Sequence, residues 1–118
     1  MAVPPSEWTI EFYTVARGDS PVLEFIGGLP KEERAKAYFC LRLLREFGTK
    51  LGMPYAKPIS GHSPLWELRP KANRLIYFAH AGRRFIILHA FSKARQRIPP
   101  HEIAIAERRM AELLEREK

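Results

Sequence analysis

Four basic side chains in the second half of the chain are of the types that bind and cut phosphodiesters. They are Arg69, Arg74, His89 and Lys93. Guanidinium and ammonium groups hold phosphates, and an imidazole or an amine of lowered pKa can move a proton to or from a sugar hydroxyl. No acidic residue lies between positions 68 and 101 to neutralise these cations. We therefore expect this segment to bind an anion.

The whole chain of 118 residues is basic, with a formal net charge of +7 and an isoelectric point near 9.9. The charge is segregated, because the helical patterns before and after segment 68–101 mix both signs. Segregated positive charge is typical of a surface that binds nucleic acid. A basic face that only keeps the protein soluble is the alternative that charge alone leaves open.

Periodicity in the first half of the chain predicts one strand followed by two helices. Apolar and polar residues alternate over residues 7–14, which indicates a strand. Ser20 before Pro21 is typical of a helix start, and the pair at 27–28 is a glycine stop. A longer helix is predicted from Pro30 to Gly48. Its lone Cys40 lies on the apolar face and is interpreted as a core residue, not a nucleophile.

The second half predicts a loop, three strands and a final helix. Segment 48–64 is rich in glycine and proline and is interpreted as one long surface loop. Short turns separate three apolar runs, as in antiparallel hairpins. These runs are residues 65–69, 73–80 and 84–91. A helix over 100–116 follows two prolines, so the predicted fold class is α+β in the order β-α-α-β-β-β-α, within one domain spanning 1–118.

Alternation along the predicted strands indicates which side chains share a face. Helices covering one side of the sheet would leave its other face available. Arg69 ends one predicted strand and Arg74 begins the next. In the last strand, strict alternation places His89 on the same side as Phe85, Ile87 and Phe91. A concave face of this kind suits RNA, since arginines hold phosphates and aromatic rings stack on bases. The alternative is a solvated sheet face with one buried histidine.

Two segments together carry a family resemblance. LWELRPKANRLIYF and ILHAFSKARQRIPPHEIAIAERRM resemble the second half of the RelE/ParE toxins, and most closely the HigB-like, phage-derived branch. The resemblance implies a four-stranded antiparallel sheet with an N-terminal helical hairpin. It also implies a metal-independent endoribonuclease without a cofactor, which cuts mRNA on the ribosome. A HigA-like helix-turn-helix antitoxin would mask the site.

The resemblance implies a role for each basic residue. Arg74 would neutralise the phosphate and stabilise the transition state, with Arg69 orienting the phosphate beside it. Lys93 would take the proton of the attacking 2′-hydroxyl or bind phosphate. His89 is the candidate that donates a proton to the departing 5′-oxygen, because it is the imidazole placed both inside a predicted strand and near Lys93. Further RNA contacts are predicted for Lys71, Phe91, Arg95 and Arg97.

The chain departs from the family pattern in two places. Ala94 stands where the family has a second lysine, and no tyrosine follows the last strand. Tyr77, in the strand before it, is predicted to be a core residue. His62 and His80 could replace His89 in proton transfer. Glu67 could also act as a base, although pairing with the nearby Arg69 is the simpler interpretation.

Two other functions remain open from the sequence. One is a ParE-like inhibitor of DNA gyrase, which would not need the basic cluster and His89. The other is a nucleic-acid or ribosome-binding module whose cations contact only phosphates. No apolar run is long enough to cross a bilayer and the first residues lack a secretory pattern, so we expect a cytoplasmic protein.

Overall fold

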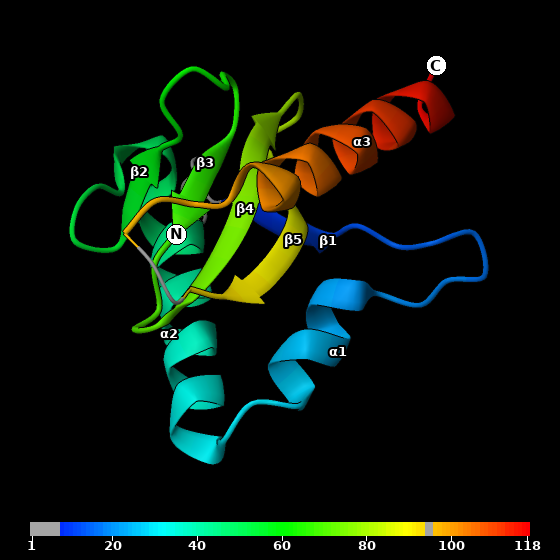
Figure 1. The fold of residues 1–118 in the computed structure, drawn as a ribbon. Helices are drawn as coiled ribbons and strands as arrows, with labels where there is room; N and C mark the ends of the chain where they lie inside the picture. The colour runs from blue at the N-terminus through cyan, green and yellow to red at the C-terminus, as the bar shows by residue number, and fades with distance from the viewer. Residues whose placement is uncertain (1–7, 94–95) are drawn as a thin grey trace, which may run out of the picture.

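A computed structural model describes residues 8–93 and 96–118, which form an α+β fold around a five-stranded sheet (Figure 1). The strands are β1 (Thr9–Phe12), β2 (Ala56–Pro58), β3 (Trp66–Leu68), β4 (Asn73–His80) and β5 (Arg84–Ser92). The helices are α1 (Pro21–Gly27), α2 (Lys31–Phe47) and α3 (Pro100–Arg116), and a 3-10 turn, η1 (Gly48–Lys50), follows α2. The predicted fold class is confirmed.

The ends of the first two helices lie where the sequence places them. The Ser20 hydroxyl caps α1 by accepting a hydrogen bond from the backbone N–H of Leu23 at 3.2 Å. The first turn of α2 carries two glutamates, which suit the positive end of the helix dipole. Gly48 ends α2 with a φ of 60°, a left-handed conformation that favours glycine.

The sheet has the order β1-β5-β4-β3-β2, and its first pair corrects the expectation of four antiparallel strands. β1 runs parallel to β5, with Thr9 beside Arg84 and Phe12 beside Ile87. A parallel pair needs a long connection, and the chain between β1 and β5 includes both helices of the hairpin. The neighbours β3, β4 and β5 are antiparallel, as predicted.

The segment predicted as one long loop, 48–64, contains the fifth strand. β2 pairs antiparallel with β3, placing Lys57 opposite Glu67 and Pro58 opposite Trp66. Three residues are too few to show alternation, and the proline disguises the strand. Proline is tolerated here because β2 lies at the edge of the sheet, where one row of N–H groups needs no partner strand.

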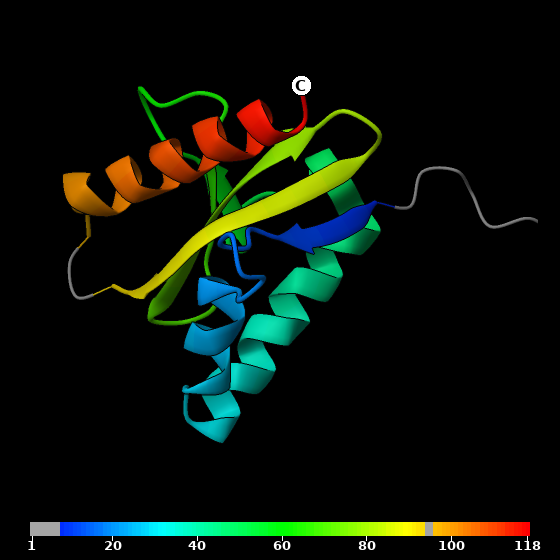
Figure 2. The ribbon, with the colours of Figure 1, turned by 90° about the vertical axis from the view of Figure 1, so that its right-hand side faces the viewer.

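Helices cover both faces of the sheet (Figure 2). The hairpin of α1 and α2 packs on one face, where Val22 and Leu44 meet Leu75 of β4. α3 packs on the other face, where Ile103 and Ala106 belong to the same core as Ile76 and Leu88. The expectation of an uncovered second face is therefore wrong, because the apolar stripe of α3 is buried against it.

A β-bulge in β5 corrects the predicted neighbours of His89. Ile76 pairs with His89 and Tyr77 pairs with Ile87, so Leu88 has no partner of its own. The extra residue interrupts strict alternation. His89 therefore shares its face with Ile86 and Leu88 of the α3-side core, and not with Phe85 or Ile87.

Among the helices within residues 8–93 and 96–118, none is both long and apolar enough to cross a bilayer.

The contact between Gly48 and Trp8 generates a test of the fold. A Cβ at Gly48 would collide with the Trp8 indole, and φ there is already unfavourable for other residues. Gly48→Ala is expected to lower the free energy of unfolding by about 1–3 kcal/mol in urea titrations. Gly52→Ala is the control, because a Cβ there meets open space. Equal effects of the two changes would contradict this packing.

Candidate active site

A buried carboxylate lies at the centre of the site. Glu67 is the middle residue of β3 and is only 3% exposed. Its Oε1 accepts a hydrogen bond from Nη1 of Arg69 at 2.5 Å and lies 3.4 Å from Nε of Arg74. A charge this deep is tolerable only when paired, so Glu67 fixes the positions of two guanidinium groups. This confirms the predicted pairing of Glu67 with Arg69.

Arg74 is itself buried, with 8% of its surface exposed. Its Nη1 donates to the backbone carbonyls of Lys71 at 2.6 Å and Asn73 at 2.7 Å, which are in and beside the turn that joins β3 to β4. Its buried Nε has no hydrogen-bond partner within the described chain. Burial lowers the pKa of Arg74, and the charge of Arg69 lowers it further. The side chain is held rigidly beside the turn.

Lys93 follows β5 directly and completes the site with Lys57. Its backbone N–H donates to the carbonyl of Ala72 at 2.7 Å, which places it beside the same turn. Loss of hydration lowers the pKa of the Lys93 amine, and the charges of Arg74, Arg69 and Lys57 lower it further. Glu67 opposes this effect. We call the four basic residues the cation cluster: Lys57, Arg69, Arg74 and Lys93.

The cluster rests on a polar contact between α2 and the strand ends. Asn73, 1% exposed, donates from Nδ2 to Glu33 of α2 at 2.9 Å. Its Oδ1 accepts from the Ser92 hydroxyl at 3.0 Å. Asn73 and Ser92 immediately precede Arg74 and Lys93, so these contacts fix the backbone from which both cations project.

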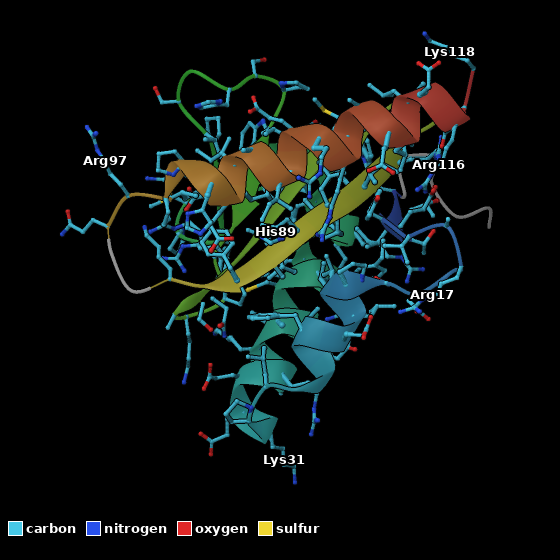
Figure 3. All side chains as sticks on the ribbon, turned by 45° about the vertical axis from the view of Figure 1, so that its right-hand side comes forward. Arg17, Lys31, His89, Arg97, Arg116 and Lys118 are labelled. Atoms are coloured by element: carbon cyan, nitrogen blue, oxygen red, sulfur yellow. The ribbon has the colours of Figure 1, made fainter. Side chains whose placement is uncertain are left out.

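His89 lies apart from the cluster's contacts and is bound to α3 (Figure 3). Its Nε2 is 2.6 Å from a Glu102 oxygen, and Nη1 of Arg109 is 3.2 Å from its Nδ1. Because arginine can only donate, Nδ1 accepts and Nε2 carries the proton that binds Glu102. Burial lowers the pKa of His89, with the Glu102 carboxylate acting in the opposite direction. Both ring nitrogens are occupied within the protein.

The other predicted RNA contacts are spread over different environments. Lys71 is exposed in the turn beside Arg74, with a φ of 54°. Arg97 is exposed and extends away from the body of the protein (Figure 3). Phe91 is 6% exposed and stacks on His89 within the core, so its ring is not available to a base. Arg95 lies outside the described residues.

The alternative residues also have structural partners. His62 contacts Glu107 of α3, and His80 contacts Glu117, the residue directly after α3. Tyr77 is 3% exposed in the core, as predicted, and burial raises its pKa. The buried Cys40 is likewise a core residue.

Sequence reasoning missed Lys57 and the support from Asn73. Lys57 lies in the segment predicted to be a loop, and the pairing of β2 with β3 places it opposite Glu67. Asn73 stands alone in an apolar run, and a polar residue in a buried strand is the signal that could have identified it.

Comparison with protein families identifies a group to which the chain belongs. Residues 24–111 match the family described as phage-derived protein Gp49-like (DUF891). The chain belongs to the Gp49-like family. The matched segment includes Glu67 and the whole cation cluster, but not β1. A search of curated proteins finds no match. Between residues 8–93 and 96–118, no group of three or more histidine, cysteine or acidic side chains could hold a metal ion.

Removing the Glu67 charge should destabilise the Gp49-like fold. Glu67→Gln leaves Arg69 and Arg74 without their anion, and loss of one partner of a buried pair typically costs about 3–5 kcal/mol. Urea unfolding measures the change. Glu107→Gln, at the exposed contact with His62, is the matched control and should change stability by less than about 1 kcal/mol. Similar losses in both variants would show that Glu67 does not organise the cluster.

Burial of His89 predicts a pH dependence of stability. Because the folded state lowers its pKa, the unfolded chain binds more protons once the pH approaches its ordinary value of 6.5. The contribution of His89 to the free energy of unfolding is therefore lost as the pH falls through its ordinary value toward the lowered pKa of the folded state. His89→Gln retains an N–H donor for Glu102 without titrating, so its stability should decline less steeply. Identical slopes would contradict this environment for His89.

Proposed function

We propose that this Gp49-like protein is the toxin of a toxin–antitoxin pair and acts as a metal-independent endoribonuclease on mRNA. Membership of the Gp49-like family, whose members are toxin-like, supports the biological role, and the motifs that resemble HigB-like toxins agree with it. The observation that carries the chemistry is the amine of Lys93, whose pKa is lowered within a cluster of cations organised by a buried carboxylate. An amine of lowered pKa beside phosphate-binding arginines is suited to cutting RNA through its own 2′-hydroxyl.

Arg69 and Arg74 form the phosphate-binding part of the proposed site. Arginine binds phosphate oxygens through a planar set of N–H donors. Both guanidinium groups are fixed by Glu67 before RNA arrives, and Arg74 is also fixed by two backbone carbonyls. Donors that need no reorganisation stabilise the additional negative charge of the transition state most effectively.

Lys93 is the proposed general base. Its neutral amine takes the proton of the 2′-hydroxyl, and the 2′-oxygen forms a bond to the adjacent phosphorus. The bond from phosphorus to the 5′-oxygen breaks, and this oxygen leaves with a proton. We assign that proton to the ammonium group of Lys57, whose charge acts on Lys93 and which lies on β2 opposite Glu67. The products are a 2′,3′-cyclic phosphate and a 5′-hydroxyl.

His89 has a structural role in this proposal. Its two nitrogens bind Glu102 and Arg109 of α3, so proton donation to RNA would require both contacts to break. The imidazole instead connects β5 to the first turns of α3. Lys57 therefore takes the role of proton donor that the sequence predicts for His89.

The proposed partners follow from the charge of the cluster. mRNA held on the ribosome presents an extended backbone to the exposed Lys57 and Lys71. A HigA-like antitoxin would oppose this contact by covering the basic surface with acidic or apolar groups. Masking of the cations would leave the toxin inactive until the antitoxin is lost.

Lys93→Arg separates catalysis from binding. Arginine retains the positive charge but cannot act as a base near neutral pH, so cleavage should fall by about 10²–10⁴-fold while RNA binding persists. Cleavage is measured by primer extension after induction without an antitoxin, and binding by titration of labelled RNA. Lys50→Arg, an exposed lysine in η1, is the matched control. Full toxicity of Lys93→Arg would exclude Lys93 as the base.

Arg74→Ala tests the phosphate site. Loss of one pre-positioned donor to a developing charge typically costs about 10²–10³-fold in rate, and the same loss of RNA cutting is expected here. RNA cut after induction without an antitoxin should end in a 2′,3′-cyclic phosphate, detected by mass spectrometry. Growth arrest without RNA cuts would favour a gyrase inhibitor. Fragments that end in a 3′-hydroxyl, with a phosphate on the new 5′ end, would refute the mechanism.

A further inference from the structure

The outer edge of β1 is the most distinctive surface that the proposed reaction does not use. The N–H groups of Thr9 and Tyr13 donate to carbonyls of Arg83 and Ile87, each at 2.9 Å, on the side of β5. By alternation, the backbone groups of Ile10 and Phe12 point the other way. No other strand of the described chain pairs with that side. β1 therefore presents a row of hydrogen-bonding groups at the sheet edge.

The two edges of the sheet differ in how they are protected. β2 is three residues long and carries an exposed lysine and a proline, which discourage further strand pairing. β1 has no proline, and its only charged residue is Glu11. Both carboxylate oxygens of Glu11 bind Arg84, at 2.6 and 2.8 Å, so this charge is already neutralised within the protein. Only the β2 edge carries features that prevent pairing.

An open groove lies on each side of this edge, and Ile10 and Phe12 line both. The groove between β1 and α2 has a volume of about 680 Å³. Its walls are mostly apolar, with Trp8 and Leu41 among them, and Arg42 and Arg45 of α2 also line it. The second groove, between β1 and α1, has about 640 Å³. Figure 2 shows β1 at the front of the molecule, with α2 beside it.

We propose that the β1 edge binds an extended segment of a protein partner, which adds a sixth strand to the sheet. Backbone hydrogen bonds to Ile10 and Phe12 would supply affinity. Side chains on one face of the added strand would enter the groove beside α2, which selects apolar residues at alternate positions. A carboxylate between or beyond them would meet Arg42, so the recognised segment is apolar and acidic.

A second copy of this chain is a poorer occupant of the same edge. Each chain carries a net charge of +7. Pairing of β1 with the β1 of a second copy would bring the two Arg42 side chains, one from each copy, toward the same interface. Like charges at an interface oppose association. The segment recognised must therefore be supplied by a different protein of opposite charge.

The inference does not rest on RNA cleavage. β1 and β2 lie at opposite edges of the sheet, and the cation cluster comes from β2, β4 and the residues directly after β3 and β5. A partner strand on β1 would leave the cluster uncovered. Lys93→Arg should accordingly bind the partner segment like the unchanged protein, whether or not the chain cuts RNA.

The test uses a library of displayed twelve-residue peptides selected against the full-length protein. The expected consensus has apolar residues at alternate positions and at least one acidic residue. Bound peptide should slow amide exchange at Ile10 and Phe12 in NMR spectra of the unchanged protein. Ile10→Pro removes an outward N–H and should weaken binding by about tenfold, whereas Ile10→Ala retains that N–H and is the matched control. Arg42→Glu should weaken binding of the same acidic peptides.

Three results would overturn the proposal. One is the absence of a consensus among selected peptides. Another is a consensus peptide that leaves the exchange of Ile10 and Phe12 unchanged, which places binding elsewhere. The third is a dimer by sedimentation equilibrium in which these amides are already protected, which assigns the edge to a second copy. The exchange measurement needs no substitution, so misfolding of Ile10→Pro cannot obscure the outcome.

Discussion

The candidate active site depends on one buried interaction, between the carboxylate of Glu67 and the guanidinium groups of Arg69 and Arg74. A lone carboxylate in the core would be strongly destabilising, and so would two arginines close together without an anion. Together they form a compact charged unit on the α3 side of the sheet. This unit has a net positive charge, because it holds two guanidinium groups and one carboxylate. Its positive charge contributes to lowering the pKa of the nearby Lys93.

The position of Lys93 follows from the strands around this unit. The hairpin of β4 and β5 brings the end of β5 back to the turn after β3, where the backbone N–H of Lys93 binds Ala72. Edge strand β2 adds Lys57 opposite Glu67. Crowded cations and partial burial then favour the neutral amine of Lys93. The same sheet leaves β1 available at its far edge, so chemistry and partner binding can occupy separate ends of one small domain.

The sequence predicted the regular elements because their signals are local. Ser20, Gly48 and the alternation in β4 and β5 each act within a few residues, and the pairing of Glu67 with Arg69 needs only their spacing. Three features escaped prediction because tertiary contacts decide them. β2 is strand only through pairing with β3, the bulge at Leu88 redirects His89, and α3 covers a face that was expected to be open. Lys57, which the sequence did not indicate, therefore lies opposite Glu67, and His89 is bound to α3.

The central claim is that a carboxylate-organised cluster holds Lys93 in a state from which it can accept a proton. The most direct measurement is an NMR titration of lysine side chains, with Lys93 assigned through Lys93→Arg. The account predicts that Lys93 titrates below the ordinary lysine pKa of 10.5, and lower still in Glu67→Gln, because Glu67 is the group that opposes the shift. A Lys93 that titrates with the exposed lysines, unchanged by Glu67→Gln, would contradict the account.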